Sequence, residues 1–183
     1  MKLKLQNVRV AFLKCWKAET VNGEGDPAFS ASFILPPNHP QVAEIEAALL
    51  ACAKEKWGAK ADAVFKQMKA SDKLALHDGD TKAQYDGFEG NLFISSRSKT
   101  RPLTINRDKS PLAEEDGILY SGCYVNVSLE LWAQDNNYGK RVNAQLGGIQ
   151  FSRDGDAFSG GGSAADEDDF DELNDGADAD SVV

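Results

Sequence analysis

The chain has 183 residues, enough for one folded domain, and its formal net charge of −9 is distributed very unevenly. All 20 lysines and arginines precede Ser159, whereas nine of the 29 acids fall within residues 166–180. We therefore expect a formally neutral domain at residues 1–158, and a flexible Gly/Ser linker with a disordered acidic tail at residues 159–183. Because the acidity lies in the tail, it does not exclude a polyanionic partner.

Cysteine and histidine content argues against a metal centre. The three cysteines are far apart and the two histidines complete no zinc-ligand spacing. No apolar run reaches the length of a membrane span, and the amino terminus lacks a signal-peptide core. We expect a reduced, cytoplasmic protein with no metal, no cofactor and no membrane partner.

The first part of the chain alternates apolar and polar residues. Residues 2–12 predict a strand whose register slips once at Gln6-Asn7, where a β-bulge would fit. A Gly-rich loop at 22–27 separates it from a second strand at 29–35, which two prolines end.

Helical periodicity follows. Pro40 suits a first helical position, and apolar residues then recur at helical spacing up to Trp57, with Gly58 as a stop. A shorter helix is predicted over 61–68. Both are expected to pack as amphipathic helices against a sheet, and the residues from 74 to 90 are expected to form a loop.

A strand is predicted over residues 91–105, with cations on one face. Alternate positions place these side chains on the same side of the strand: Phe93, Ser95, Arg97, Lys99 and Arg101. Two further cations, Arg107 and Lys109, follow directly.

A hairpin is predicted over residues 122–151, with a polar turn at 134–139. Its first arm alternates strictly, so that one face is apolar while the other carries Tyr124 and Trp132. Gly147-Gly148 interrupts the second arm and indicates a bulge or bend of the kind that closed barrels need.

The chain carries few signs of catalysis. It contains no phosphate-binding glycine loop, no Gly-x-Ser-x-Gly and no His-Glu-x-x-His. Asp78 and Asp80 suit a metal ion less well than a turn built from Asp and Gly. We therefore expect a protein that is not an enzyme; a metal-dependent nuclease using these two residues is the remote alternative.

Nucleic-acid binding fits the sequence better. Affinity for the backbone requires a track of cations, and sequence-tolerant binding of single strands requires aromatic faces on which bases stack. The candidate cations are Arg97, Lys99, Arg101, Arg107, Lys109, Lys140 and Arg141. The candidate stacking platforms are Tyr85, Phe93, Tyr124, Trp132 and Tyr138. The competing interpretation is that the cations only aid solubility and the aromatic rings pack in the core.

Three segments resemble a phage family once catalogued only as a domain of unknown function. They are Ile94-Ser-Ser-Arg-Ser-Lys-Thr-Arg-Pro102, Gly122-Cys-Tyr-Val-Asn126 and Gly147-Gly-Ile-Gln-Phe151. Members of that family are single-stranded DNA-binding proteins, and the resemblance covers roughly residues 2–158. It implies a mainly β (α+β) protein, a five-stranded OB-fold-like barrel with a helical insertion, in which Arg97, Lys99 and Arg101 contact DNA. It also implies work in phage replication or recombination, in the cytoplasm of an infected bacterium.

The tail is expected to compete with DNA for the same surface and to recruit phage or host replication or recombination proteins. Its candidate partner-binding residues are Asp166, Glu167, Asp168, Asp169, Phe170, Asp171 and Glu172. The alternative is an acidic protein-interaction or DNA-mimic protein, in which the tail is the working part and the domain a scaffold. The sequence leaves the oligomeric state open.

Overall fold

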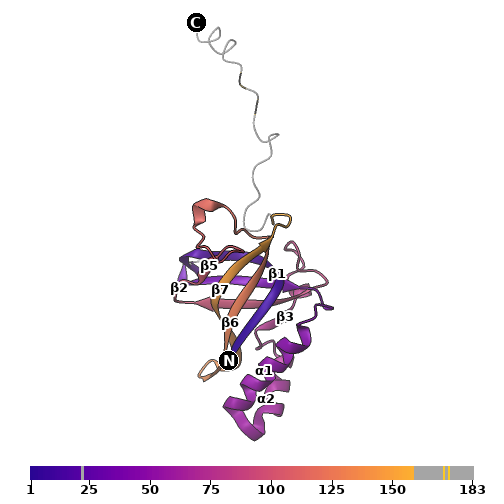
Figure 1. The fold of residues 1–183 in the computed structure, drawn as a ribbon. Helices are drawn as coiled ribbons and strands as arrows, with labels where there is room; N and C mark the ends of the chain where they lie inside the picture. Colours follow the sequence, from indigo (N-terminus) through magenta and orange to yellow (C-terminus); the bar gives the residue numbers. More distant parts are fainter. Residues whose placement is uncertain (22, 159–170, 172, 174–183) are drawn as a thin grey trace.

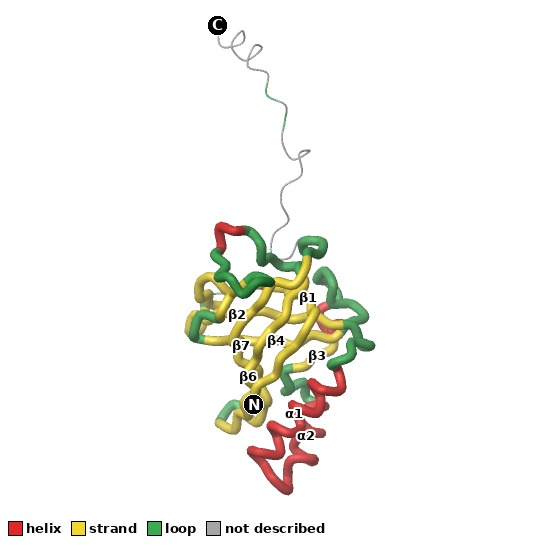
Figure 2. The backbone as a smooth tube through the Cα atoms, in the orientation of Figure 1, coloured by secondary structure: helices red, strands yellow, loops and turns green. Residues whose placement is uncertain are grey.

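The computed structural model describes residues 1–21, 23–158, 171 and 173, and the domain is mostly β with a helical insertion (Figures 1 and 2). The strands are β1 (Lys2–Val21), β2 (Glu24–Leu35), β3 (Leu76–Asp78), β4 (Leu92–Ser98), β5 (Leu103–Ile105), β6 (Tyr124–Asn136) and β7 (Gly139–Arg153). The α-helices are α1 (Val42–Trp57) and α2 (Ala61–Ala70), and short 3-10 helices are η1 (Gly58–Lys60), η2 (Gly79–Lys82) and η3 (Glu114–Asp116).

Five of these strands close a barrel. β1 pairs antiparallel with β2 and with β6, β2 pairs with β4, and β6 pairs with β7. The barrel closes where β4 meets β7 in parallel, at the pair Arg97 and Gln145. In the OB-fold, three antiparallel strands form a meander, and the last of them lies parallel to the final strand of the barrel. Here β1, β2 and β4 form the meander and β7 is the final strand, so the predicted fold is confirmed.

Bulges bend the long strands as the barrel requires. The register between β1 and β6 shifts between Leu5 and Val8, and Asn7 at this point has φ 55°. The register between β6 and β7 shifts beside Gly147, which pairs with no residue of β6 while Leu146 and Gly148 do. Both predicted irregularities are confirmed. Each adds one unpaired residue, which increases the local twist of the strand.

The two helices lie together at one end of the barrel (Figure 1). α1 buries Ile45, Leu49, Cys52 and Ala53 in the main core, and Gly58 ends the helix with φ 55°. These limits match the prediction, except that the helix begins at Val42 and not at Pro40. The helices therefore pack against the barrel core as expected, and they connect β2 to β3.

The region 91–105 differs from its prediction. The expected single strand ends at Ser98, whose hydroxyl accepts a hydrogen bond from the amide of Thr100 at 3.0 Å, and a separate short strand, β5, pairs in parallel with β7. Pro102 disfavours continuation because it has no N–H for a ladder. The loop expected over 74–90 also contains the short strand β3, which pairs with β4.

The barrel interior forms the main core, and a smaller aromatic cluster lies beside it around Phe88 and Phe93. The three cysteines are free and buried, and burial raises the pKa of each thiol, that of Cys15 to about 12. Within the described residues, no helix has the length and apolarity that crossing a membrane requires.

Candidate nucleic-acid interface

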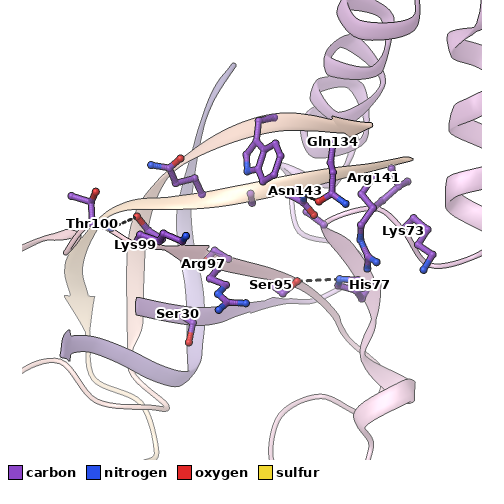
Figure 3. Close-up of a pocket in the computed structure, with 17 residues that line it drawn as sticks. Ser30, Lys73, His77, Ser95, Arg97, Lys99, Thr100, Gln134, Arg141 and Asn143 are labelled. Carbon is purple, nitrogen blue, oxygen red and sulfur yellow. Dashed lines mark hydrogen bonds between the residues drawn. The ribbon is translucent and has the colours of Figure 1, made fainter. Parts of the chain in front are cut away.

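An open pocket of about 830 Å³ lies on the outer surface of the barrel where β4 and β7 meet (Figure 3). We call it the β4–β7 pocket. Its lining comes from β2 (Ser30), the segment before β3 and β3 itself (Lys73, Leu74, Ala75, His77), β4 and the following turn (Ser95 to Thr100), and the β6–β7 hairpin (Trp132, Gln134, Arg141, Asn143, Ala144, Gln145).

Four cations line this pocket, and they come from three separate segments. Arg97 and Lys99 project from the β4 side, Arg141 from β7, and Lys73 from the turn before β3 (Figure 3). No carboxylate belongs to its lining in the part of the chain that the structure describes. The pocket therefore presents positive charge over its width, as a binding site for a phosphate backbone requires.

An exposed aromatic ring stands at the same place. Trp132 on β6 is 46% exposed, although it lies in the middle of a regular strand and pairs with Asn143 of β7. Beside it the amide of Asn143 donates to the Gln134 side chain at 3.0 Å. An indole face left open next to cations and amides is the arrangement on which unpaired bases stack without sequence preference.

His77 closes one side of the pocket and is held firmly there. Its Nδ1 lies 2.7 Å from Asp72 Oδ1, its Nε2 lies 3.1 Å from Ser95 Oγ, and its ring stacks on Phe93 at 5.0 Å. Asp72 is thus occupied by the imidazole, and Ser95 and His77 together form a polar wall (Figure 3).

Two predicted DNA contacts from the region 91–105 lie away from the pocket. Because β4 ends at Ser98, Arg101 does not continue the row of Arg97 and Lys99; its guanidinium lies 5.5 Å from the ring of Trp16. Phe93 is 3% exposed and packs edge-to-face with Phe88, so its ring does not offer a free face for a base. Strand alternation placed Phe93 correctly on its face of β4, but the loop that carries Phe88 covers it.

Two other predicted platforms are used within the protein. Tyr124 sits at the far end of β6 from Trp132, with the Arg153 guanidinium 3.7 Å from its ring centre and that of Arg9 at 5.6 Å. Tyr85 is 39% exposed and packs edge-to-face on Phe12 at 5.0 Å. Neither ring lines the β4–β7 pocket.

The remaining predicted contacts lie at the two ends of β7. Tyr138 is 85% exposed at the tip of the β6–β7 hairpin, where Lys140 lies 3.8 Å from Asp135. At the other end Arg107 donates to the Ser152 carbonyl at 2.7 Å, and Lys109 is exposed in the same loop. Arg97, Lys99, Arg141 and Trp132 are thus the predicted residues that the fold brings together.

The acidic residues singled out in the sequence fall into two groups. Asp78 accepts a hydrogen bond from the Asp80 amide at 2.9 Å, and Asp80 accepts one from the Gly90 amide at 2.8 Å, so both carboxylates stabilise loop turns. The tail positions Asp166, Glu167, Asp168, Asp169, Phe170 and Glu172 lie outside the described residues; Asp171 is described and exposed.

The sequence did not indicate Lys73 or His77 as residues of the site, although both line the pocket. Lys73 reaches the pocket because its carbonyl accepts a hydrogen bond from the Val142 amide at 3.2 Å, and Leu74 pairs with Val142 in a parallel bridge. This contact joins segments that are far apart in the sequence, so no local pattern reveals it. The polar face of the hairpin was a usable signal for Asn143 and Gln134.

An OB-fold barrel with a cationic, aromatic pocket on its outer face defines the chain as a protein of the nucleic-acid-binding class. Over residues 1–182 the sequence matches the family described as the single-stranded DNA-binding protein of Enterobacter phage Enc34, and the chain belongs to that family. The resemblance drawn from the three sequence segments is thereby confirmed. The family consists of DNA-binding proteins and not of enzymes.

Individual proteins resemble the chain over most of its length. The chain is 45% identical over 177 residues, 95% of each protein, to the putative protein p50 of Acyrthosiphon pisum secondary endosymbiont phage 1. It superposes with a TM-score of 0.72 and 27% identity on the bacteriophage Enc34 protein in complex with single-stranded DNA, covering 85% of this chain and 88% of that one. The gp2.5 protein of bacteriophage T7, at 15% identity and a TM-score of 0.58, shares the fold; the match covers 94% of this chain and 98% of that one.

Proposed function

We propose that this protein binds single-stranded DNA in the β4–β7 pocket without sequence preference and without catalysis, in phage DNA replication or recombination. The observation that carries the proposal is the meeting of four cations with the half-exposed indole of Trp132 in one pocket. Cations recognise the phosphates of any sequence, and every base has a face that stacks on an aromatic ring. Coating exposed strands would protect them from nucleases and from reannealing.

A fluorescence titration with oligo-dT tests this function directly. Stacking of bases on Trp132 is expected to quench the tryptophan signal, and quenching should be lost in Trp132→Phe but kept in Trp16→Phe and Trp57→Phe. A mixed-sequence oligonucleotide should bind with similar affinity, and duplex DNA of the same length should compete poorly. Absence of saturable oligo-dT binding at about 50 mM salt would refute the proposal.

We further propose that residues 1–158 form the DNA-binding domain and that the acidic tail at 159–183 regulates it. The domain is formally neutral, but its β4–β7 pocket is cationic, whereas the tail contains nine acids. The reach expected of a Gly/Ser-linked segment of 25 residues is about 25–30 Å, comparable with the width of a small barrel. Bound at the pocket, the tail would be displaced by DNA and would then be available to replication or recombination proteins.

Ending the chain after Phe158 is therefore expected to raise affinity for single strands, most clearly at low salt where screening is weakest. Phe158 must be kept, because its amide donates to the Ser121 carbonyl at 2.9 Å and its ring lies 4.2 Å from the Arg9 guanidinium. Affinity would be measured at several salt concentrations.

The matched control is a full-length chain in which the nine tail acids are replaced by amides. It should bind as tightly as the shortened chain if charge is the cause. Equal affinity of the shortened and full-length chains at low salt would contradict competition by the tail. A DNA-mimic role for the tail, with the domain only a scaffold, predicts instead that the shortened chain does not bind single strands.

A further inference from the structure

Two of the four pocket cations already contact one residue of the protein, and one of the two contacts is with a carboxylate. The start of β2 carries Asp26, whose carboxylate Oδ2 lies 3.2 Å from Lys99 Nζ. The main-chain carbonyl of the same residue accepts a hydrogen bond from Arg97 Nη2 at 2.9 Å. One residue thus supplies two oxygens to two adjacent cations of the β4–β7 pocket.

We propose that Asp26 is an intramolecular competitor for DNA, which occupies the position that a phosphate of the bound strand would take on Lys99 and Arg97. This inference rests on the proposed function of the pocket. A phosphate offers anionic oxygens to neighbouring cations, as the Asp26 carboxylate does to Lys99, and lysine and arginine are its usual protein partners. DNA would therefore have to displace the carboxylate from Lys99 before its phosphate makes that contact.

The contact is built so that it can be exchanged. Both members of the ion pair are 78% exposed, and an exposed pair of this kind contributes little net free energy because water and salt screen it. The carbonyl contact with Arg97 belongs to the main chain and holds the start of β2 on Arg97 whichever side chain stands at position 26. Removing the carboxylate should therefore free Lys99 without moving the start of β2.

The start of β2 also contains a matched acid that lacks this contact. Glu24 is exposed, two residues before Asp26, and it pairs with neither Arg97 nor Lys99 among the ion pairs of the described residues. Asp26→Asn and Glu24→Gln change the net charge by the same amount. General electrostatic attraction toward DNA therefore changes alike in the two variants, and only the local contact differs.

The experiment compares oligo-dT affinities of the wild type, Asp26→Asn and Glu24→Gln in the full-length chain. We expect Asp26→Asn to bind about two- to fivefold more tightly than Glu24→Gln at low salt, with the difference shrinking as salt rises. In a Lys99→Ala background the advantage of Asp26→Asn over Glu24→Gln should disappear, which assigns the effect to this pair. Thermal unfolding of each variant verifies that the fold is intact.

The outcomes separate this inference from the proposed function. If the wild type binds oligo-dT but the two variants bind equally well, the competitor role is wrong and the proposed function stands. Weaker binding by Asp26→Asn also overturns it, because Asp26 would then be holding Lys99 in place for DNA. If the wild type does not bind oligo-dT at all, the proposed function fails and this inference fails with it.

Discussion

Replacing Arg97, Lys99 and Arg141 together by alanine is expected to flatten the plot of log affinity against log salt by about 2. Each phosphate contact with a single strand contributes about 0.7 to that slope through counterion release, and three contacts are lost. Extrapolated from a reference near 1 M salt, the same loss corresponds to binding weaker by about 10²- to 10³-fold at 50 mM. All three side chains line the β4–β7 pocket, and they come from β4, from the turn that follows it and from β7.

The matched control removes three exposed lysines from the helices, Lys54, Lys56 and Lys66, which changes net charge equally without altering the lining of the pocket. This control should keep nearly the full salt slope. Neither triple variant should change thermal stability greatly, since exposed substitutions away from special features usually cost under about 0.5 kcal/mol each. A salt slope unchanged in the pocket variant would show that these side chains do not contact the DNA backbone.

Arg101→Ala provides an internal comparison. Its guanidinium lies against Trp16 and not in the pocket, so its loss should alter the salt slope less than the loss of Lys99, two residues earlier. Equal effects of the two single substitutions would mean that the DNA path extends beyond the pocket toward β5.

Trp132→Ala is expected to weaken binding of single strands by about 1–3 kcal/mol, which is about 5- to 150-fold in affinity. The indole is 46% exposed among cations and amides, so the substitution removes a surface on which a base stacks. Trp132→Phe keeps an aromatic face and should lose less. Because stacking is largely independent of salt, the salt slope should remain close to that of the wild type, in contrast to the triple cation variant.

Tyr124→Ala tests the same strand at its other end. Tyr124 lies eight residues from Trp132, about 26 Å along the strand, and its ring is enclosed by Arg153 and Arg9. We expect this substitution to lower the midpoint of thermal unfolding and to leave pocket binding nearly unchanged. If Trp132→Ala folds and binds normally while Tyr124→Ala binds poorly, the interface lies at the opposite end of the hairpin.

Much of the fold could be predicted from the sequence because strands, bulges and helix ends depend on neighbouring residues. Alternation placed Val125, Val127 and Leu129 inside the barrel, and all three are buried. The bulges at Asn7 and Gly147 and the helix stop at Gly58 follow from local backbone preferences. The uneven distribution of charge, with nine acids in residues 166–180 and every lysine and arginine before Ser159, is a property of composition alone.

The site depended more on tertiary structure. The alternation of residues over 91–105 predicted one continuous strand. In the structure β4 ends at Ser98 and the separate strand β5 pairs with β7. Arg101 therefore lies against Trp16 and apart from Arg97 and Lys99. Burial of Phe93 depends on a loop that no local pattern positions.

Local residue patterns predict which residues face outward on each strand and where the positive and negative charges lie along the chain. Which of those residues meet depends on how distant segments pack together. The parallel pairing of β4 with β7, the contact of Lys73 with Val142 and the position of Asp26 over Lys99 each join segments separated by tens of residues. Such contacts arise from closure of the barrel, a global constraint of packing and hydrogen bonding that local periodicity does not contain.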